Sequence, residues 1–274
     1  MVPTAASMNG YASANVAATI DGLKMLFHAN ACQAVFVDPE IIQNAPYELT
    51  VAGLGDVIAK PVSSADWKLN HFLFEEYYCQ FAVDLLKDLE PVYLENPKGI
   101  KLKQPESFKA LFEALLYSSI AMTITGTSSP ASGGEHLISH TIDMISARDG
   151  KTHDLHGRQV GVAAVLMAAL YEKIMEINTP LFGEIPQHVN KEFWGTLAPV
   201  VSKEYEKKLE KFDKAKRFLS QPGHWNQLKK QIQPHLIPAQ KLKDCLVEAG
   251  GAHRYSDIRV KHAAMGRNDF SAVV

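Results

Sequence analysis

The sequence has only three cysteines among 274 residues: Cys32, Cys79 and Cys245. No CxxC pair occurs, so we expect neither a disulfide framework nor a thiolate zinc site. Such sparse cysteine suits a reducing compartment. The N-terminus also lacks the basic, apolar and cleavable pattern of a signal peptide. We therefore predict a cytoplasmic protein.

Long apolar runs and an excess of positive charge are lacking too. The longest largely apolar stretch, 160–171, has about a dozen residues, fewer than the roughly 20 that a helix needs to cross a bilayer. Lys and Arg total 28 and Asp and Glu total 30, a formal net charge of −2. We therefore expect no membrane insertion and no nucleic-acid partner.

Several nucleotide and nucleophile motifs are absent from the sequence. It contains no GxSxG elbow, no Walker loop and no GxGxxG turn. A serine hydrolase, a P-loop nucleotidase and a chain with an intact dinucleotide fingerprint are therefore not indicated.

What is present is mostly helical periodicity, which dominates after about residue 40. Residues 34–37 are instead typical of a short strand closed by Asp-Pro, and 90–106, punctuated by Pro and Gly, is typical of a surface connection. The fold class predicted is mainly α, with a strand-containing N-terminal portion over 1–40 and a helical domain over 41–274. The helices predicted lie over 45–60, 64–89, 106–124, 136–146, 157–177 and 203–219.

Three polar side chains stand at the ends or starts of helical segments: Asp56, His136 and His156. One carboxylate and two imidazoles suit a single zinc, nickel or iron(II) ion. Three protein ligands leave a coordination position open, which favours catalysis over a structural plug. Taken singly, Asp56 could equally be a helix cap, and His136 with His140 two satisfied interfacial histidines.

The surroundings of these histidines add further hypotheses. The loop 132–134 delivers His136 to a helix N-terminus, where free N–H groups favour an anion such as phosphate. His140 shares a helix face with His136, because the two are four residues apart. His153 is typical of a solvated loop residue, whereas His156 opens a strongly apolar helix and is the better site candidate.

The combination of segments is more specific than any one of them. VPTAASMNGYAS, NACQAVFVDPEIIQNAP, GLGDVIAK followed by DWKL, GTSSPASGGEHLISH and DLHGRQVGV occur in this order. In content and order they resemble the sn-glycerol-1-phosphate dehydrogenases. This family belongs to the superfamily of iron-containing alcohol dehydrogenases and glycerol dehydrogenases, which shares its fold with dehydroquinate synthase.

The resemblance implies a C-terminal, all-helical metal-binding domain of dehydroquinate synthase-like fold, preceded by a Rossmann-like nucleotide-binding domain. It implies a metal-dependent oxidoreductase of phospholipid metabolism that interconverts dihydroxyacetone phosphate and sn-glycerol 1-phosphate with NAD or NADP. The substrate would be a small phosphorylated three-carbon molecule. The metal ligands of the family fall on Asp56, His136 and His156, with zinc as the first choice and nickel or iron as alternatives.

Further roles follow from the resemblance. Lys60 and His140 lie one helical turn beyond two of the ligands, and they are the candidates to hold the substrate phosphate or assist proton transfer. Thr4 and Ser7 correspond to the segment that lies against the nicotinamide end of the cofactor. The family carries Asp where this chain has Asn9, which removes a negative charge near substrate or cofactor.

The family pattern also places a Gly-rich pyrophosphate loop upstream of VPTAAS, where this sequence begins. We therefore expect residues 1–40 to be the remnant of a nucleotide-binding domain, with an exposed apolar patch, and the chain alone to be weak or inactive. The alternatives are a non-catalytic metal-binding or assembly module and a superfamily dehydrogenase for another polyol. Expected partners are a separately encoded nucleotide-binding half or a second copy. The final sequence, AAMGRNDFSAVV, departs from the family pattern.

Overall fold

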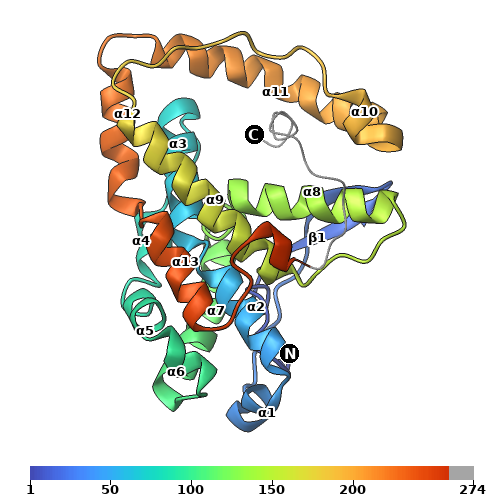
Figure 1. Cartoon of the computed structure of the whole chain (residues 1–274), viewed down its shortest axis with the longest axis vertical. Coiled ribbons are helices and arrows are strands. Elements are labelled where there is room, and N and C mark those ends of the chain that lie inside the picture. Colours follow the sequence, from blue (N-terminus) through green and yellow to red (C-terminus); the bar gives the residue numbers. More distant parts are fainter. Residues whose placement is uncertain (259–274) are drawn as a thin grey trace.

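The computed structural model describes residues 1–258 and shows a mainly helical protein with one two-stranded sheet near its N-terminal end (Figure 1). This confirms the predicted fold class. The segment AAMGRNDFSAVV, and with it the end of the predicted 41–274 domain, lies outside the described residues. The α-helices are α1 (Pro39–Asn44), α2 (Tyr47–Val57), α3 (Lys60–Phe74), α4 (Gln80–Asp84), α5 (Glu90–Glu95), α6 (Pro97–Lys101), α7 (Pro105–Thr125), α8 (Gly134–Arg148), α9 (His156–Glu176), α10 (Lys191–Trp194), α11 (Ala198–Leu219), α12 (His224–Ile232) and α13 (Ala239–Glu248); 3-10 turns cover Gly195–Leu197, Gln233–His235 and Tyr255–Asp257.

The sheet is an antiparallel hairpin of β1 (Asn15–Ile20) and β2 (Leu23–His28). Its two turn residues, Asp21 and Gly22, have φ values of 51° and 81°. Positive φ at both positions gives the twist that joins antiparallel strands, and Asp-Gly is a favoured pair for it. The sequence therefore carried a hairpin signal that the predicted elements did not include.

The strand predicted over 34–37 is wrong. The terminal amino group of Met1 donates to the Ala34 carbonyl at 2.8 Å, and the Phe36 N–H donates to the Met1 carbonyl at 3.0 Å. These bonds reach a single residue, and a contact of one residue does not build a ladder.

Two helical predictions also need correction. The helix predicted over 64–89 begins earlier and ends at Phe74, because Glu75 turns into the left-handed region with φ 58°. The predicted surface connection 90–106 instead holds α5 and α6, which bury Tyr93 and Ile100 completely. Proline opens each of these helices, at a position where no N–H is needed. The helices predicted over 106–124, 136–146, 157–177 and 203–219 are confirmed as α7, α8, α9 and α11.

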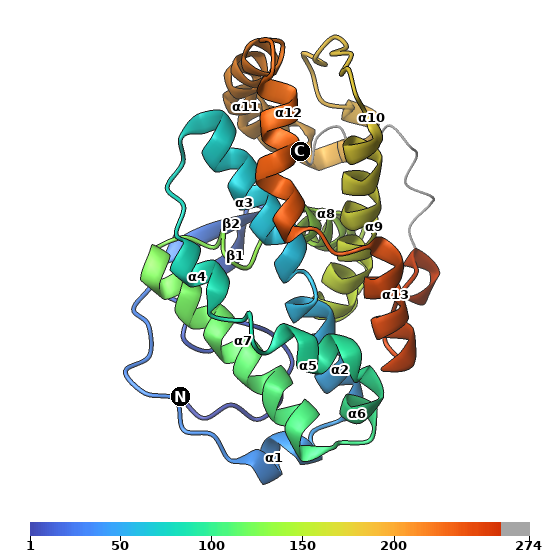
Figure 2. The same cartoon turned by 90° about the vertical axis from the view of Figure 1, so that its left-hand side faces the viewer.

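The main core forms where α9 packs against α2, α8 and α13, while α7 packs against α2 (Figures 1 and 2). Among the described helices, α7 is long and apolar enough to cross a membrane. However, 56% of its apolar window is buried inside the protein. Its composition is thus explained by packing in this core. Fully buried members of the core include Leu54, Leu111, Leu115, Val160 and Leu242.

A smaller apolar cluster attaches the hairpin to the helices. Leu23, at the start of β2, packs with Ile145 of α8 and with Trp194 and Leu197. The rest of the hairpin is largely exposed. The apolar surface predicted within residues 1–40 is present, since Val2, Val16, Ile20, Leu26 and Phe36 are all exposed.

Candidate metal centre

Asp56 lies near the end of α2 and its side chain is completely buried. The N-terminal segment comes close to this helix because Gly53 has no side chain: a Cβ there would lie 2.1 Å from the Ala6 carbonyl oxygen. The close approach allows the main-chain N–H of Asn9 to donate to Asp56 Oδ2 at 2.8 Å. One carboxylate oxygen is thereby held in place, and Oδ1 is left for other partners.

His156 reaches the same place through the crossing of α2 and α9. A Cβ on Gly157 would lie 1.8 Å from the Ala52 carbonyl oxygen, and one on Gly55 would lie 2.1 Å from the Gly157 carbonyl oxygen. Only glycine at these positions allows the two backbones to touch. His156 is the first residue of α9, and its Nε2 lies 3.9 Å from Asp56 Oδ1.

His136 comes from a third element, the first turn of α8. Its Nε2 lies 3.3 Å from Asp56 Oδ1. One ligand atom from each of Asp56, His136 and His156 can be chosen so that all three lie within 4.8 Å of one another. The three residues that the sequence singled out as ligands are therefore brought together by three different helices.

The hydrogen bonds around this trio leave one atom of each residue available to bind an ion. Asp56 Oδ1 is buried and has no hydrogen-bond partner. His136 Nδ1 lies 2.8 Å from Glu135 Oε1, and His156 Nδ1 lies 3.2 Å from Ser139 Oγ. These contacts hold Nδ1 of both histidines and turn each Nε2 toward the Asp56 carboxylate, where Nε2 of His136 would offer a lone pair once an ion displaces its proton. Such outer partners fix the orientation of metal-binding histidines, so the residues fit a divalent cation.

The electrostatics of the cluster follow from burial and close charges. Burial alone would lower the pKa of His136, but the carboxylates of Asp56 and Glu135 outweigh it and raise the pKa to about 9. Burial also favours the neutral form of Asp56, yet its close contact with His136 and the nearby charge of the histidines lower its pKa overall. The trio therefore holds an ionised carboxylate that attracts a positive charge.

The other two imidazoles near this carboxylate are kept neutral. Burial and the charge of His136 lower the pKa of His156 to about 4, although Asp56 acts in the opposite direction. Burial, with the charges of His136 and His156, lowers the pKa of His140 to about 3. The His140 ring centre lies 6.0 Å from that of His156 and 6.3 Å from that of His136. His140 thus borders the cluster, as its spacing on the helix predicts.

Lys60 is buried and is the first residue of α3, so the helix predicted over 45–60 ends at Val57 and Lys60 does not share a helix with Asp56. Its ammonium donates to the Pro130 carbonyl at 2.9 Å and to the Ala82 carbonyl at 3.5 Å. Burial lowers its pKa to about 8, against the charges of Glu90 and Asp84. Lys60 therefore attaches the loop that precedes α8 to α3.

The residues predicted to lie near the cofactor are spread along the N-terminal segment. The Asn9 main chain bonds Asp56 directly, and the Ser7 N–H donates to the Tyr11 hydroxyl at 3.1 Å. Thr4 is exposed. Of the three, Asn9 is the one joined to the metal cluster by a hydrogen bond.

Four residues near the site were not among the sequence candidates: Glu135, Ser139, Lys24 and Asp143. Glu135 precedes a predicted ligand and Ser139 follows it by three residues, so helical spacing could have indicated both. Lys24 and Asp143 are 119 residues apart, and only the fold brings them together.

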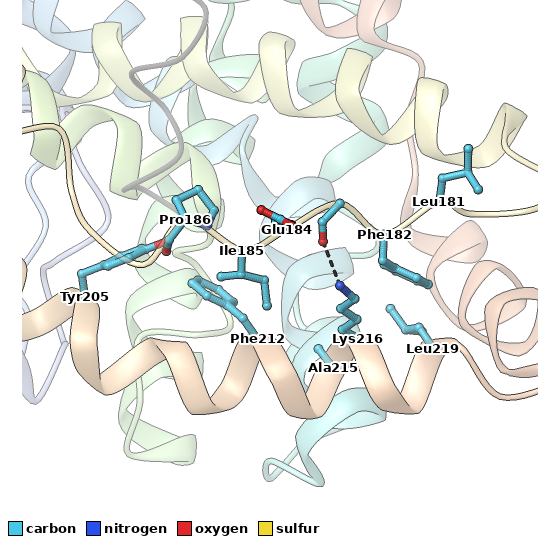
Figure 3. Close-up of a pocket in the computed structure, with 11 residues that line it drawn as sticks. Leu181, Phe182, Glu184, Ile185, Pro186, Tyr205, Phe212, Ala215, Lys216 and Leu219 are labelled. Atoms are coloured by element: carbon cyan, nitrogen blue, oxygen red, sulfur yellow. Dashed lines mark hydrogen bonds between the residues drawn. The ribbon is translucent and has the colours of Figure 1, made fainter.

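A hollow lies elsewhere in the described part of the chain. A groove of about 360 Å³ lies between residues 181–186 and α11, and the Lys216 ammonium donates to the Gly183 carbonyl at 2.9 Å within it (Figure 3). Its lining is mostly apolar and includes none of the three candidate ligands. The chemistry of the cluster and the shape of this groove are therefore unrelated.

Comparison with known proteins supports the family resemblance of the sequence. Residues 1–46 match the family model described as iron-containing alcohol dehydrogenase. The NAD(P)+ glycerol-1-phosphate dehydrogenase of Halalkalibacterium halodurans is 35% identical over 195 residues, which are 68% of this chain and 49% of that protein. The one from Pyrococcus horikoshii is 39% identical over 171 residues, 62% of this chain and 48% of that protein. The chain belongs to the glycerol-1-phosphate dehydrogenase family.

The chain spans about half the length of the curated members of the family that it matches. Among solved structures, the glycerol dehydrogenase of Schizosaccharomyces pombe is similar with a TM-score of 0.49 and 16% identity, over 93% of this chain and 66% of that one.

Proposed function

We propose that this chain carries the metal- and substrate-binding part of an NAD(P)-linked dehydrogenase that interconverts dihydroxyacetone phosphate and sn-glycerol 1-phosphate. One observation carries the proposal: Asp56 Oδ1 is buried without a hydrogen-bond partner and faces Nε2 of both His136 and His156. A buried, ionised oxygen without a donor is costly. A divalent cation shared with the two imidazoles would satisfy it.

In this proposal Asp56, His136 and His156 hold the ion, zinc first and nickel or iron as alternatives. When bound, the ion would supply Lewis-acid polarisation of the substrate oxygen that changes between carbonyl and hydroxyl. Glu135 and Ser139 orient the two ligand imidazoles. His140 presents a neutral ring beside the cluster, where it can exchange a proton or a hydrogen bond with the substrate. Lys60 remains a candidate for the substrate phosphate or for assisting proton transfer.

The nicotinamide cofactor would supply the hydride chemistry. We propose that Thr4, Ser7 and Asn9 lie at its nicotinamide end. The hydrogen bond from the Asn9 main chain to Asp56 supports this, because it holds the segment beside the metal cluster.

For a polypeptide of these 274 residues by itself we propose weak turnover. The sequence contains no GxGxxG turn, and main-chain contacts from such a turn usually anchor the dinucleotide pyrophosphate. A separately encoded nucleotide-binding half or a second copy is the proposed partner, and the cytoplasm the proposed location.

Metal binding by the purified chain tests the proposal. We expect about one equivalent of Zn²⁺ or Ni²⁺ per chain, measured by calorimetry with elemental analysis, and His136→Ala should abolish it. His224→Ala is the matched control, because His224 lies far along the chain on α12 and bonds the Phe218 carbonyl. Full stoichiometry in His136→Ala would disprove the ligand assignment. Turnover of dihydroxyacetone phosphate with NADH and NADPH then measures activity, and family-like rates would contradict the weak turnover proposed.

A further inference from the structure

The hairpin lies beside α8 (Figure 1), and one of its charged side chains contacts that helix. Lys24 of β2 places its ammonium 3.1 Å from Asp143 Oδ2. Asp143 Oδ1 lies 3.3 Å from His153 Nδ1, in the loop before α9. The Asp143 side chain is 9% exposed, that of Lys24 21% and that of His153 53%. The cluster is therefore partly buried and still open to solvent.

The position of this cluster relative to the metal ligands follows from one helix. His136, His140 and Asp143 lie at positions i, i+4 and i+7 of α8 and so share a face. At 1.5 Å per residue, His136 and Asp143 are about 10 Å apart along the axis. The Lys24 ammonium thus lies beyond His140 on the stripe that begins at a metal ligand.

The other candidate lysine is held elsewhere. The Lys60 ammonium donates to the Pro130 carbonyl at 2.9 Å and to the Ala82 carbonyl at 3.5 Å. Of the two lysines, Lys24 is the one whose ammonium pairs with a residue on the helix face that carries His136 and His140.

A contribution to folding stability does not account well for this ion pair. A partly exposed lysine–carboxylate pair contributes little to folding, and the hairpin is already attached through the burial of Leu23. An ammonium has three N–H donors, and Asp143 Oδ2 occupies one of them. The carboxylate holds the cation at a fixed place and leaves donors for an anion.

We propose that Lys24 binds the phosphate group of the substrate, with Asp143 holding its ammonium in position. The inference rests on the proposed function, which requires a phosphate at one end of a three-carbon molecule whose oxygen reaches the metal at the other. Charge-assisted hydrogen bonds from lysine are a common means of binding phosphate. Lys24 thus becomes a specificity residue that separates phosphorylated substrates from free polyols.

Calorimetry on the zinc-loaded full chain tests the assignment, with sn-glycerol 1-phosphate and glycerol as the two probes. Lys24→Met should weaken binding of the phosphate ester by roughly tenfold or more and leave the affinities for glycerol and zinc unchanged. Lys24→Arg should restore most of the loss. Lys173→Met is the matched control, because Lys173 pairs with Glu176 on the surface. This variant should bind both probes as the unaltered chain does.

Three results would overturn the inference alone. Lys24→Met could bind the phosphate ester normally, or it could lose glycerol and the ester equally, which would indicate a general effect on the site. Lys60→Met could instead be the variant that loses the preference for the ester, which would assign the phosphate to Lys60. A chain that binds zinc but no sn-glycerol 1-phosphate would refute the proposed substrate and the inference together, whereas the first three results leave the proposed function standing.

Discussion

The main-chain N–H of Asn9 donates a 2.8 Å hydrogen bond to Oδ2 of Asp56, which leaves Oδ1 facing the two candidate imidazoles. Because the donor belongs to the main chain, Asn or Asp at position 9 can make the same bond. The departure from the family pattern at this position therefore leaves the orientation of the carboxylate intact. What it changes is the charge of the side chain at position 9.

The partner of His136 should tune metal affinity. Glu135→Gln keeps an oxygen that can accept from Nδ1 but removes the negative charge, and Glu135→Ala removes both. We expect zinc to bind roughly tenfold more weakly in the first variant and nearer a hundredfold more weakly in the second. Competition with a chromophoric chelator measures the affinities. Glu113→Gln, on the exposed side of α7, should bind zinc normally, and equal affinities in all four chains would contradict the role of Glu135.

The crossing of α2 and α9 should tolerate no side chain at Gly157. An alanine Cβ there would meet the Ala52 carbonyl oxygen at 1.8 Å, and neither backbone can move without displacing His156. We expect Gly157→Ala to lower the free energy of unfolding in urea by about 1–3 kcal/mol and to weaken zinc binding. Gly183→Ala is the control, since no atom lies within 4 Å of its Cβ position. A Gly157→Ala chain with unchanged stability and zinc affinity would disprove the close crossing.

The buried Lys60 should give stability a distinctive pH dependence. Its pKa is about 8 in the folded chain against 10.5 ordinarily, so between these values the unfolded chain binds more protons. Stability must then rise with pH in this window, by roughly 3 kcal/mol at most. Urea unfolding from pH 7.5 to 10.5 should show this rise in the unaltered chain relative to Lys60→Met, in which no amine titrates.

The exposed Lys173 provides the control for that measurement. Lys173→Met should keep the same rise as the unaltered chain. Parallel pH profiles for the unaltered chain and Lys60→Met would show that the Lys60 amine is not buried as the structure has it.

Local patterns predicted the long helices well, because α7, α8, α9 and α11 each carry their own periodicity. They failed where a single residue changes direction. Glu75 ends α3 by adopting a left-handed backbone conformation, which a glutamate in the sequence does not indicate. The Asp21–Gly22 pair, by contrast, is a typical turn sequence, and the prediction did not use it. Residues 34–37 have the composition of a strand, but a strand needs a neighbouring ladder, and the described chain gives it only Met1.

The sequence by itself determined which residue types could bind a cation, and their order along the chain identified the family. It also determined that His140 lies one helical turn beyond His136, whereas Lys60, expected one turn beyond Asp56, begins a separate helix. Tertiary structure decided the rest: the glycine-mediated crossing that joins Asp56 to His156, the attachment of Lys60 to main-chain carbonyls, and the approach of Lys24 to Asp143. Spacing within a helix is set by its own backbone, whereas contacts between distant segments depend on how closely the backbones can pack.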